Sequence, residues 1–202
     1  FTLSHDEAAA IIAEDGGSAE VIVPYLNAKA LNSHPEHRAD RMVINFRDWS
    51  EQRAMEYETC FSIVKERVRP ERLQISGNSS TARRRREAWW IYASDARHLY
   101  EKLQPLERAI AIARVSNTLM PVFVDPRQVL TLDLVVFPTD SAGDLSVLSS
   151  AFHRWWAVAR ASTMRTDIRY SVTDVFNTFP WPLPQAIDNL SDIGERLTQY
   201  RQ

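Results

Sequence analysis

The sequence predicts an α+β fold in which an antiparallel or mixed β-sheet is flanked by helices and followed by a long C-terminal helix. Two observations support this prediction. Residues 109–115, 120–124 and 129–137 are rich in valine and isoleucine, as strands are, and Asp125-Pro126 marks a turn between the last two runs. The runs lie close together in the chain and resemble an antiparallel meander. Several longer segments instead repeat apolar residues at helical spacing.

The composition is that of an ordinary soluble globular protein. The chain has 202 residues, of which 45% are hydrophobic and 25% charged, so it is long enough to bury a core. Its apolar runs fall short of the roughly 20 residues that cross a bilayer, and it does not begin with a signal peptide. Cys60 is the only cysteine, which agrees with a reducing cytoplasm. Because Phe1 is not a methionine, we expect a piece of a longer protein.

The first elements follow from capping and turn signals. Ser4 and Glu7 have the spacing of a capping box, which predicts a helix over residues 6–13 that ends at Gly16-Gly17. Residues 21–26 form a predicted strand, and Pro24 places it at an edge or a bend.

The next region is predicted to be a polar loop over residues 31–40. It holds His34 and His37, which we expect to be solvated, because the sequence around them does not complete a metal site. Residues 41–46 form the second predicted strand.

A long helix is predicted over residues 51–68, with Asp48 or Ser50 as its N-cap and Pro70 as its end. Its apolar positions fall at helical spacing and should face the core: Ala54, Tyr57, Phe61, Val64 and Val68. Cys60 lies beside that stripe, and we interpret it as a core residue rather than a nucleophile.

The stretch from 74 to 86 combines a turn-like segment, residues 77–81, with the run Arg83-Arg84-Arg85-Arg86. Trp89 and Trp90 follow after two intervening residues and are predicted to be core residues. A basic run of this kind suits the phosphate backbone of a nucleic acid. The alternative interpretation is a solvated charged loop, because charge runs often only interact with water.

Three further helices complete the prediction. One runs to Leu103 and is capped by Ser94 or Asp95, and one runs from about Gln185 to Tyr200. The third covers residues 144–161, is capped by Asp140 or Ser141 and carries an apolar stripe of Leu145, Leu148, Phe152, Trp155 and Trp156.

The segment after that third helix carries the best candidate site. Arg165, Asp167 and Arg169 alternate with other residues, so in one extended segment their side chains would project to the same side. Arginine fits the O6/N7 edge of guanine, and aspartate accepts from the N4 amine of cytosine. The same pattern is also typical of a solvated strand edge with cross-strand ion pairs.

Residues 176–182 are aromatic and rich in proline, which predicts a rigid, packed anchor beside the candidate site. We interpret its aromatic side chains as core rather than as a ligand platform. Motifs for catalysis are missing: the sequence has neither a glycine-rich phosphate loop nor a Gly-x-Ser-x-Gly or His-Glu-x-x-His motif. We therefore predict a binding module without catalytic or metal-ligating residues, and we keep an enzyme with an unfamiliar site as a remote alternative.

An ordered series of short motifs resembles the target recognition domain of MmeI-like (type IIL) restriction-modification enzymes and related adenine-specific DNA methyltransferases. The resemblance covers residues 18–182, and each motif is weak alone but specific in this order. The motifs are Pro24-Tyr25-Leu26-Asn27, Leu31-Asn32-Ser33, Met42-Val43-Ile44-Asn45-Phe46, Arg85-Arg86-Glu87-Ala88-Trp89-Trp90, Arg169-Tyr170-Ser171 and Val175-Phe176-Asn177-Thr178-Phe179-Pro180-Trp181-Pro182.

The resemblance implies a module that recognises a sequence in double-stranded DNA for a bacterial, cytoplasmic enzyme. Its partners would be the DNA and the methyltransferase and nuclease domains of the same polypeptide, of which the methyltransferase would bind S-adenosylmethionine. In this family the base-reading side chains precede the Tyr-Ser segment, which points to Arg165, Asp167 and Arg169.

On this interpretation residues 83–86 and Arg160 would bind the DNA backbone. Residues 1–182 would form the recognition domain, and residues 183–202 a C-terminal helical extension. The alternative function is an Arg-rich protein-protein or regulatory interaction domain.

Overall fold

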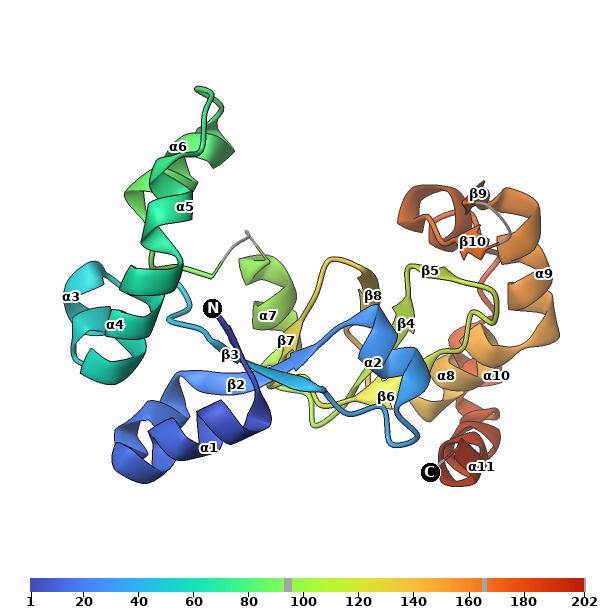
Figure 1. Ribbon diagram of the computed structural model, residues 1–202. Coiled ribbons are helices and arrows are strands. Elements are labelled where there is room, and N and C mark those ends of the chain that lie inside the picture. The colour runs from blue at the N-terminus through green and yellow to red at the C-terminus, as the bar shows by residue number, and fades with distance from the viewer. Residues whose placement is uncertain (93–95, 165–166, 202) are drawn as a thin grey trace. The chain divides into compact units, whose positions relative to one another are not determined.

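The computed structural model describes residues 1–92, 96–164 and 167–201 and confirms the α+β fold (Figure 1). The chain divides into two compact units. Unit 1 comprises Phe1–Tyr25 and Asp40–Ala96, and unit 2 comprises Leu26–Ala39 and Arg97–Gln202. Among the described residues, the helices are all too short or too polar to span a membrane.

Unit 1 is built on three short antiparallel strands in the order β1–β3–β2: β1 (Thr2–Leu3), β3 (Arg41–Ile44) and β2 (Ile22–Leu26). Helix α1 (His5–Glu14) begins with the predicted capping box. The Ser4 hydroxyl accepts from the Glu7 N–H at 3.1 Å, and the Glu7 carboxylate accepts from the Ser4 N–H at 2.8 Å. A short 3₁₀ helix, η1 (Gly16–Glu20), leads from α1 to β2.

The prediction of one helix over residues 51–68 is wrong, because the chain forms two helices there: α3 (Glu51–Met55), capped by Ser50, and α4 (Glu58–Arg67). The break falls at Tyr57, whose backbone leaves the helical region (φ −99°, ψ 67°). The Tyr57 ring stacks on Trp49 at 5.5 Å between centroids, and its hydroxyl donates to Glu20. These two contacts use a side chain that a continuous helix would direct elsewhere.

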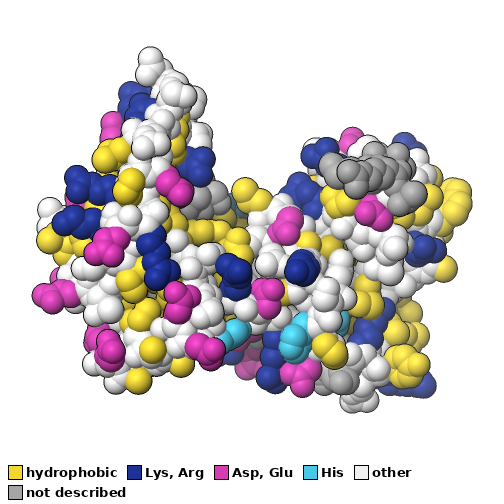
Figure 2. All heavy atoms as spheres, in the orientation of Figure 1, with side chains coloured by type: hydrophobic (Ala, Val, Ile, Leu, Met, Phe, Trp, Pro, Cys, Tyr) yellow, Lys and Arg dark blue, Asp and Glu magenta, His cyan; other side chains and the backbone are white. Residues whose placement is uncertain are grey.

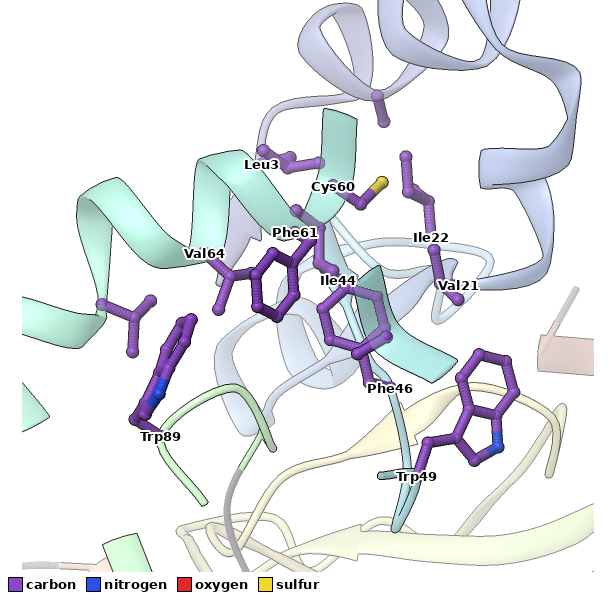
Figure 3. Packing of buried hydrophobic residues seen from close by; sticks show 13 residues of the cluster. Leu3, Val21, Ile22, Ile44, Phe46, Trp49, Cys60, Phe61, Val64 and Trp89 are labelled. Carbon is purple, nitrogen blue, oxygen red and sulfur yellow. The ribbon is translucent and has the colours of Figure 1, made fainter. Parts of the chain in front are cut away.

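The core of unit 1 lies between α4 and the strands, and Figure 3 shows its side chains. Cys60 is fully buried there, and its thiol donates to the Ser18 hydroxyl at 3.4 Å. Burial raises the pKa of Cys60, which is the opposite of what a nucleophile needs, so the prediction of a core cysteine is confirmed. Helix α4 ends at Arg67, close to the predicted end at residue 68, and Pro70 lies in the first turn of a further short helix, α5 (Arg69–Leu73).

Part of the predicted polar loop 31–40 is helical. Helix α2 (Ala28–Ser33) is capped by Asn27, whose side chain accepts from the Ala30 N–H at 2.8 Å. His37 is only partly exposed, with its Nδ1 atom 2.7 Å from the Leu31 carbonyl oxygen, so the expectation of a solvated histidine is wrong for this residue. The described residues contain no cluster of histidine, cysteine or acidic side chains that could hold a metal ion.

Unit 2 contains an antiparallel sheet in the order β6–β4–β8: β6 (Val122–Val124), β4 (Ala109–Ala113) and β8 (Leu134–Phe137). The strands are antiparallel as predicted, but the meander order is wrong because β4 is central. Strand β4 is buried along its whole length, which suits a central strand covered on both faces. The short strand β7 (Val129–Leu130) lies between β6 and β8 in the chain.

The sequence of β4 assigns its two faces. Its alanines, Ala111 and Ala113, pack with Leu26 and the buried residues of α2, whereas Ile110 and Ile112 pack with the opposite core cluster. Small side chains on one face allow α2 to approach closely, and large ones fill the space on the other. The second cluster also contains Leu145 from the helix that follows the sheet, and it supports the candidate site.

The predicted helix over residues 144–161 also divides in two: α8 (Ala142–Ser149), capped by Ser141, and α9 (Ala151–Arg160), capped by Ser150. Ser150 has an extended backbone, and its hydroxyl accepts from the His153 N–H at 3.1 Å, which starts a new helix. Because of this break, the apolar stripe predicted for one helix does not continue along one face from α8 into α9. Leu145 and Leu148 are buried as predicted, but Phe152 and Trp155 are more than half exposed.

Two helices end the chain: α10 (Pro184–Asp188) and α11 (Ser191–Arg201), so the predicted C-terminal helix is interrupted at residues 189–190. Helix α11 packs on α8 through Gly194, where an added Cβ would overlap the Ala142 carbonyl group. Helix α7 (Arg97–Leu103) precedes the sheet, and its predicted caps, Ser94 and Asp95, lie outside the described residues. The division into residues 1–182 and 183–202 stays a prediction.

Candidate nucleic-acid interface

The predicted base-reading segment is a hairpin of two strands, β9 (Ser162–Met164) and β10 (Asp167–Arg169). The strands pair antiparallel, with Met164 opposite Asp167 and Ser162 opposite Arg169. The chain therefore reverses between residues 164 and 167, and the prediction of one extended segment is wrong. Arg165 lies outside the described residues.

Asp167 and Arg169 do share one face of β10, as the alternation predicts. Ile168, between them, packs against the core cluster of unit 2. Successive side chains of a strand point to opposite faces, so Asp167 and Arg169 are directed away from that core. Arg169 is exposed and Asp167 is half-buried. The Arg169 guanidinium, a hydrogen-bond donor, and the Asp167 carboxylate, an acceptor, therefore lie on the same face of β10. The opposite face of the strand packs on the core through Ile168.

Strand β5 (Val115–Ser116) lies on the other side of β10 and is a part of the site that the sequence did not reveal. It pairs antiparallel with β10, with Ser116 opposite Ile168 and Val115 opposite Arg169. Ser116 is buried, and its hydroxyl accepts from the Thr118 N–H at 3.2 Å, which fixes the following turn. The exposed residue Asn117 occupies that turn. Local sequence patterns do not show that this segment adjoins residues so distant in the chain.

The segment after β10 is a packed anchor, as predicted. It begins with a π-helical turn, η2 (Val172–Phe176), capped by Ser171. Val175 and Phe179 are buried, and the Phe179 ring meets Trp181 edge to face at 5.4 Å. The burial of Phe179 confirms the interpretation as core for that ring, whereas Phe176 and Trp181 are partly buried and pack against the core cluster of unit 2.

The four consecutive arginines lie on helix α6 (Ser80–Glu87) rather than in a loop. Ser79 caps the helix and accepts from the Ala82 N–H at 3.2 Å. Arg83, Arg84 and Arg85 are exposed. Positive charges in the last turn of a helix also complement its dipole, which explains part of the pattern without any ligand. Figure 2 shows basic side chains gathered over α5 and α6.

Arg86 is only partly exposed, and its guanidinium group donates hydrogen bonds within the protein. Its Nη1 atom donates to the carbonyl oxygens of Ile75 and Gly77, both at 2.8 Å. Gly77 has a φ of 94°, a conformation that favours glycine. Arg86 therefore holds the segment before α6 in place.

A buried cation of unit 1, Arg72, lies close to the arginines of α6. Arg72 is buried, and the pKa of its guanidinium is lowered by desolvation and by the positive charge of Arg85. Trp89 is buried in the core as predicted, whereas Trp90 is partly buried, packs against the same core cluster and donates its indole N–H to the Trp49 carbonyl at 2.9 Å. Mutual repulsion between neighbouring arginines makes this part of unit 1 favourable for a polyanion.

Arg160 is the last residue of α9, and it lies in unit 2 together with the hairpin. It is exposed, with its guanidinium 4.8 Å from the centroid of the Trp156 ring. The following residues lead directly into β9, so a cation stands at the start of the hairpin. The structure thus places Arg160, Asp167 and Arg169 in one unit and the arginines of α6 in the other.

Comparison with known proteins assigns the chain to a family. A family model described as "MmeI, target recognition domain" matches residues 1–183. A solved structure of the type IIL restriction-modification enzyme MmeI in complex with DNA has the same fold, with a TM-score of 0.75 and 19% identity. That match covers 100% of this chain and 26% of the other, so this chain spans about a quarter of the matched protein chain. The sequence matches none of the curated proteins.

Proposed function

This chain belongs to the family of MmeI target recognition domains, and we propose that it recognises a specific sequence in double-stranded DNA for a type II restriction-modification enzyme. The family match over residues 1–183 carries this proposal. Its support in the structure is the hairpin face on which Asp167 and Arg169 project away from the core.

In this proposal Asp167 and Arg169 contact base edges in the major groove. The Arg169 guanidinium would donate to O6 and N7 of a guanine, and the Asp167 carboxylate would accept from the N4 amine of a cytosine. Arg165 is the third proposed reading residue, on the argument from the sequence. The packed hairpin supports such a role because readout needs side chains held within about 0.5 Å of the productive geometry.

Exposed cations would bind the phosphates and set the orientation of the module on the duplex. We assign this role to Arg83, Arg84 and Arg85 on α6 and to Arg160 at the end of α9. Arg86 contributes to the same surface by fixing the segment around Gly77, because its Nη1 atom already donates to two carbonyl groups.

The parent polypeptide in this proposal is a bacterial, cytoplasmic enzyme that methylates adenine at N6 and carries a nuclease. Its methyltransferase part would bind S-adenosylmethionine and its nuclease part would cleave DNA. The recognition module would hold both at a chosen site. This chain contributes binding and orientation rather than a chemical step, which agrees with the absence of catalytic motifs from its sequence.

Binding-site selection tests the proposal. The chain is incubated with duplexes that contain a random segment, and the bound fraction is amplified and sequenced over several rounds. We expect a short consensus that includes at least one fixed guanine or cytosine. The affinity for that consensus should fall linearly on a log-log plot against salt concentration. A selected pool that stays random would contradict the proposal and favour an Arg-rich module for an acidic protein partner.

A further inference from the structure

We propose that His153 and Tyr170 form a positioning pair that holds strand β10 in the geometry required for sequence discrimination. This inference rests on the proposed function, because it concerns how accurately Asp167 and Arg169 are presented. Neither His153 nor Tyr170 faces the proposed DNA surface, and both act through the strand.

Both residues of the pair are buried, and their hydrogen bonds determine which ring nitrogen of His153 carries the proton. His153 is 2% exposed and Tyr170 is 1% exposed. The Nδ1 atom of His153 lies 2.8 Å from the Leu148 carbonyl oxygen, which only accepts, so Nδ1 carries the proton. The Nε2 atom of a neutral ring is then an acceptor, and the Tyr170 hydroxyl donates to it at 3.0 Å. Desolvation lowers the pKa of His153, in agreement with a neutral ring.

Tyr170 is held from three directions. Its backbone N–H donates to the Arg114 carbonyl at 2.8 Å, beside strand β5. Its ring meets Phe137 edge to face at 6.2 Å, and its hydroxyl is fixed by His153. Tyr170 directly follows Arg169, so a tyrosine that cannot rotate also fixes the backbone from which the Arg169 side chain projects.

The pair also closes the hairpin on itself. His153 lies on α9, the helix that leads into β9, and Tyr170 leaves β10 at the other end of the hairpin. The bond between them spans 17 residues of sequence. This hydrogen bond therefore links the helix that enters the hairpin to the residue that leaves it. Loss of that bond would free the strand to shift without unfolding the unit.

A purely structural role would give the same burial, so the test must separate the two roles. Asparagine and glutamine at position 153 each reproduce one half of the imidazole. His153→Asn places an amide near Nδ1 and keeps the bond to Leu148, whereas His153→Gln places an amide oxygen near Nε2 and keeps the bond to Tyr170. Each variant breaks one buried hydrogen bond, so both should lose a similar amount of stability.

The experiment compares the full chain with His153→Asn, His153→Gln and Tyr170→Phe. The first measurement is discrimination, the ratio of affinities for the selected duplex and for duplexes with one changed base pair. The second is backbone amide hydrogen exchange at Tyr170 and Ile168 without DNA. Melting temperatures provide the measure of stability.

We expect His153→Asn and Tyr170→Phe to lower discrimination by about two- to tenfold, the range in binding that one hydrogen bond represents. The same two variants should speed exchange at Tyr170 and Ile168. His153→Gln should keep both properties close to those of the unmodified chain despite a lower melting temperature.

Equal behaviour of His153→Asn and His153→Gln in both measurements would overturn the positioning role. A chain that shows no sequence preference before any substitution would instead refute the proposed function. The exchange measurement would still decide in that case whether the pair fixes the strand.

Discussion

Asp167 and Arg169 project together because the side chains of a strand alternate, and the residue between them is apolar. Ile168 packs against the core cluster of unit 2, so the two charged side chains beside it point to the opposite face of the strand, away from the core. Charged side chains at a surface contribute little to stability by themselves. Their value for recognition lies in their complementary chemistry, an acceptor beside a bidentate donor.

Asp167→Ala should relax recognition at one base pair of the selected site. Loss of one base contact costs about 1–3 kcal/mol of discrimination, or roughly five- to a hundredfold. Non-specific affinity should not fall, because removal of a negative charge does not weaken attraction to phosphates. Competition binding with all single-base variants of the site measures both quantities. An unchanged preference at every position would remove Asp167 from the reading face.

His153 should also make stability depend on pH. Burial lowers its pKa below the ordinary value of 6.5, so the unfolded chain binds a proton at a pH where the folded chain does not. The stability that the neutral ring contributes is fully present above pH 6.5 and is lost as the pH falls toward the lower folded pKa. Urea unfolding midpoints between about pH 5 and 8 should show this decrease. In His153→Gln the decrease over this window should be smaller.

At the scale of elements, serine hydroxyls set the boundaries of the helices. Ser50, Ser79, Ser141 and Ser150 each cap a helix, and Ser150 converts one predicted helix into two. The break at Ser150 matters for the candidate site because it sets the orientation of α9. His153 and Ala157 face the core, while Phe152 and Trp155 face outward. The anchor after β10 then packs on the inward face through Phe179.

Phe179→Ala should lower stability far more than Phe152→Ala. Phe179 is buried and its ring lies edge to face 4.9 Å from His153, whereas Phe152 is 52% exposed. Truncation of a core phenylalanine costs about 3–5 kcal/mol because it leaves a cavity. Chemical denaturation of the two variants gives the comparison. Similar midpoints would show that the anchor is not part of the core.

At the scale of the whole molecule, affinity for DNA must come from the distribution of charge. The formal net charge is −2, so the chain as a whole does not attract a polyanion. Positive charge is instead concentrated on α5 and α6, where Arg85 lies close enough to Arg72 to lower its pKa. A local excess of this kind attracts phosphates even when the net charge is negative.

The double substitution of Arg83 and Arg85 by alanine should reduce the dependence of DNA affinity on salt. Each lost phosphate contact lowers the log-log slope by about 0.9, so we expect a decrease of up to roughly two units. Sequence preference should stay the same. Arg127→Ala is the matched control, because this exposed arginine is already paired with Asp125 at 2.9 Å. A slope equal to that of the control would exclude α6 from the contact surface.

The sequence alone determined the class of fold, the capping box at Ser4 and Glu7, the buried Cys60, and the outward direction of Asp167 and Arg169. Each of these depends on residues near one another in the chain, through helical spacing, strand alternation or a cap. The family resemblance rested on an ordered series of motifs and needed no geometry, and the family match confirms it.

The tertiary structure alone decided which distant residues meet. It placed β4 between β6 and β8, brought β5 beside β10, and joined His153 to Tyr170. It also ended a predicted helix at Tyr57, where contacts with Trp49 and Glu20 override local propensity. These outcomes depend on burial and hydrogen bonding between segments far apart in the chain. A local pattern therefore gives the direction of a reading side chain but not the partner that holds it there.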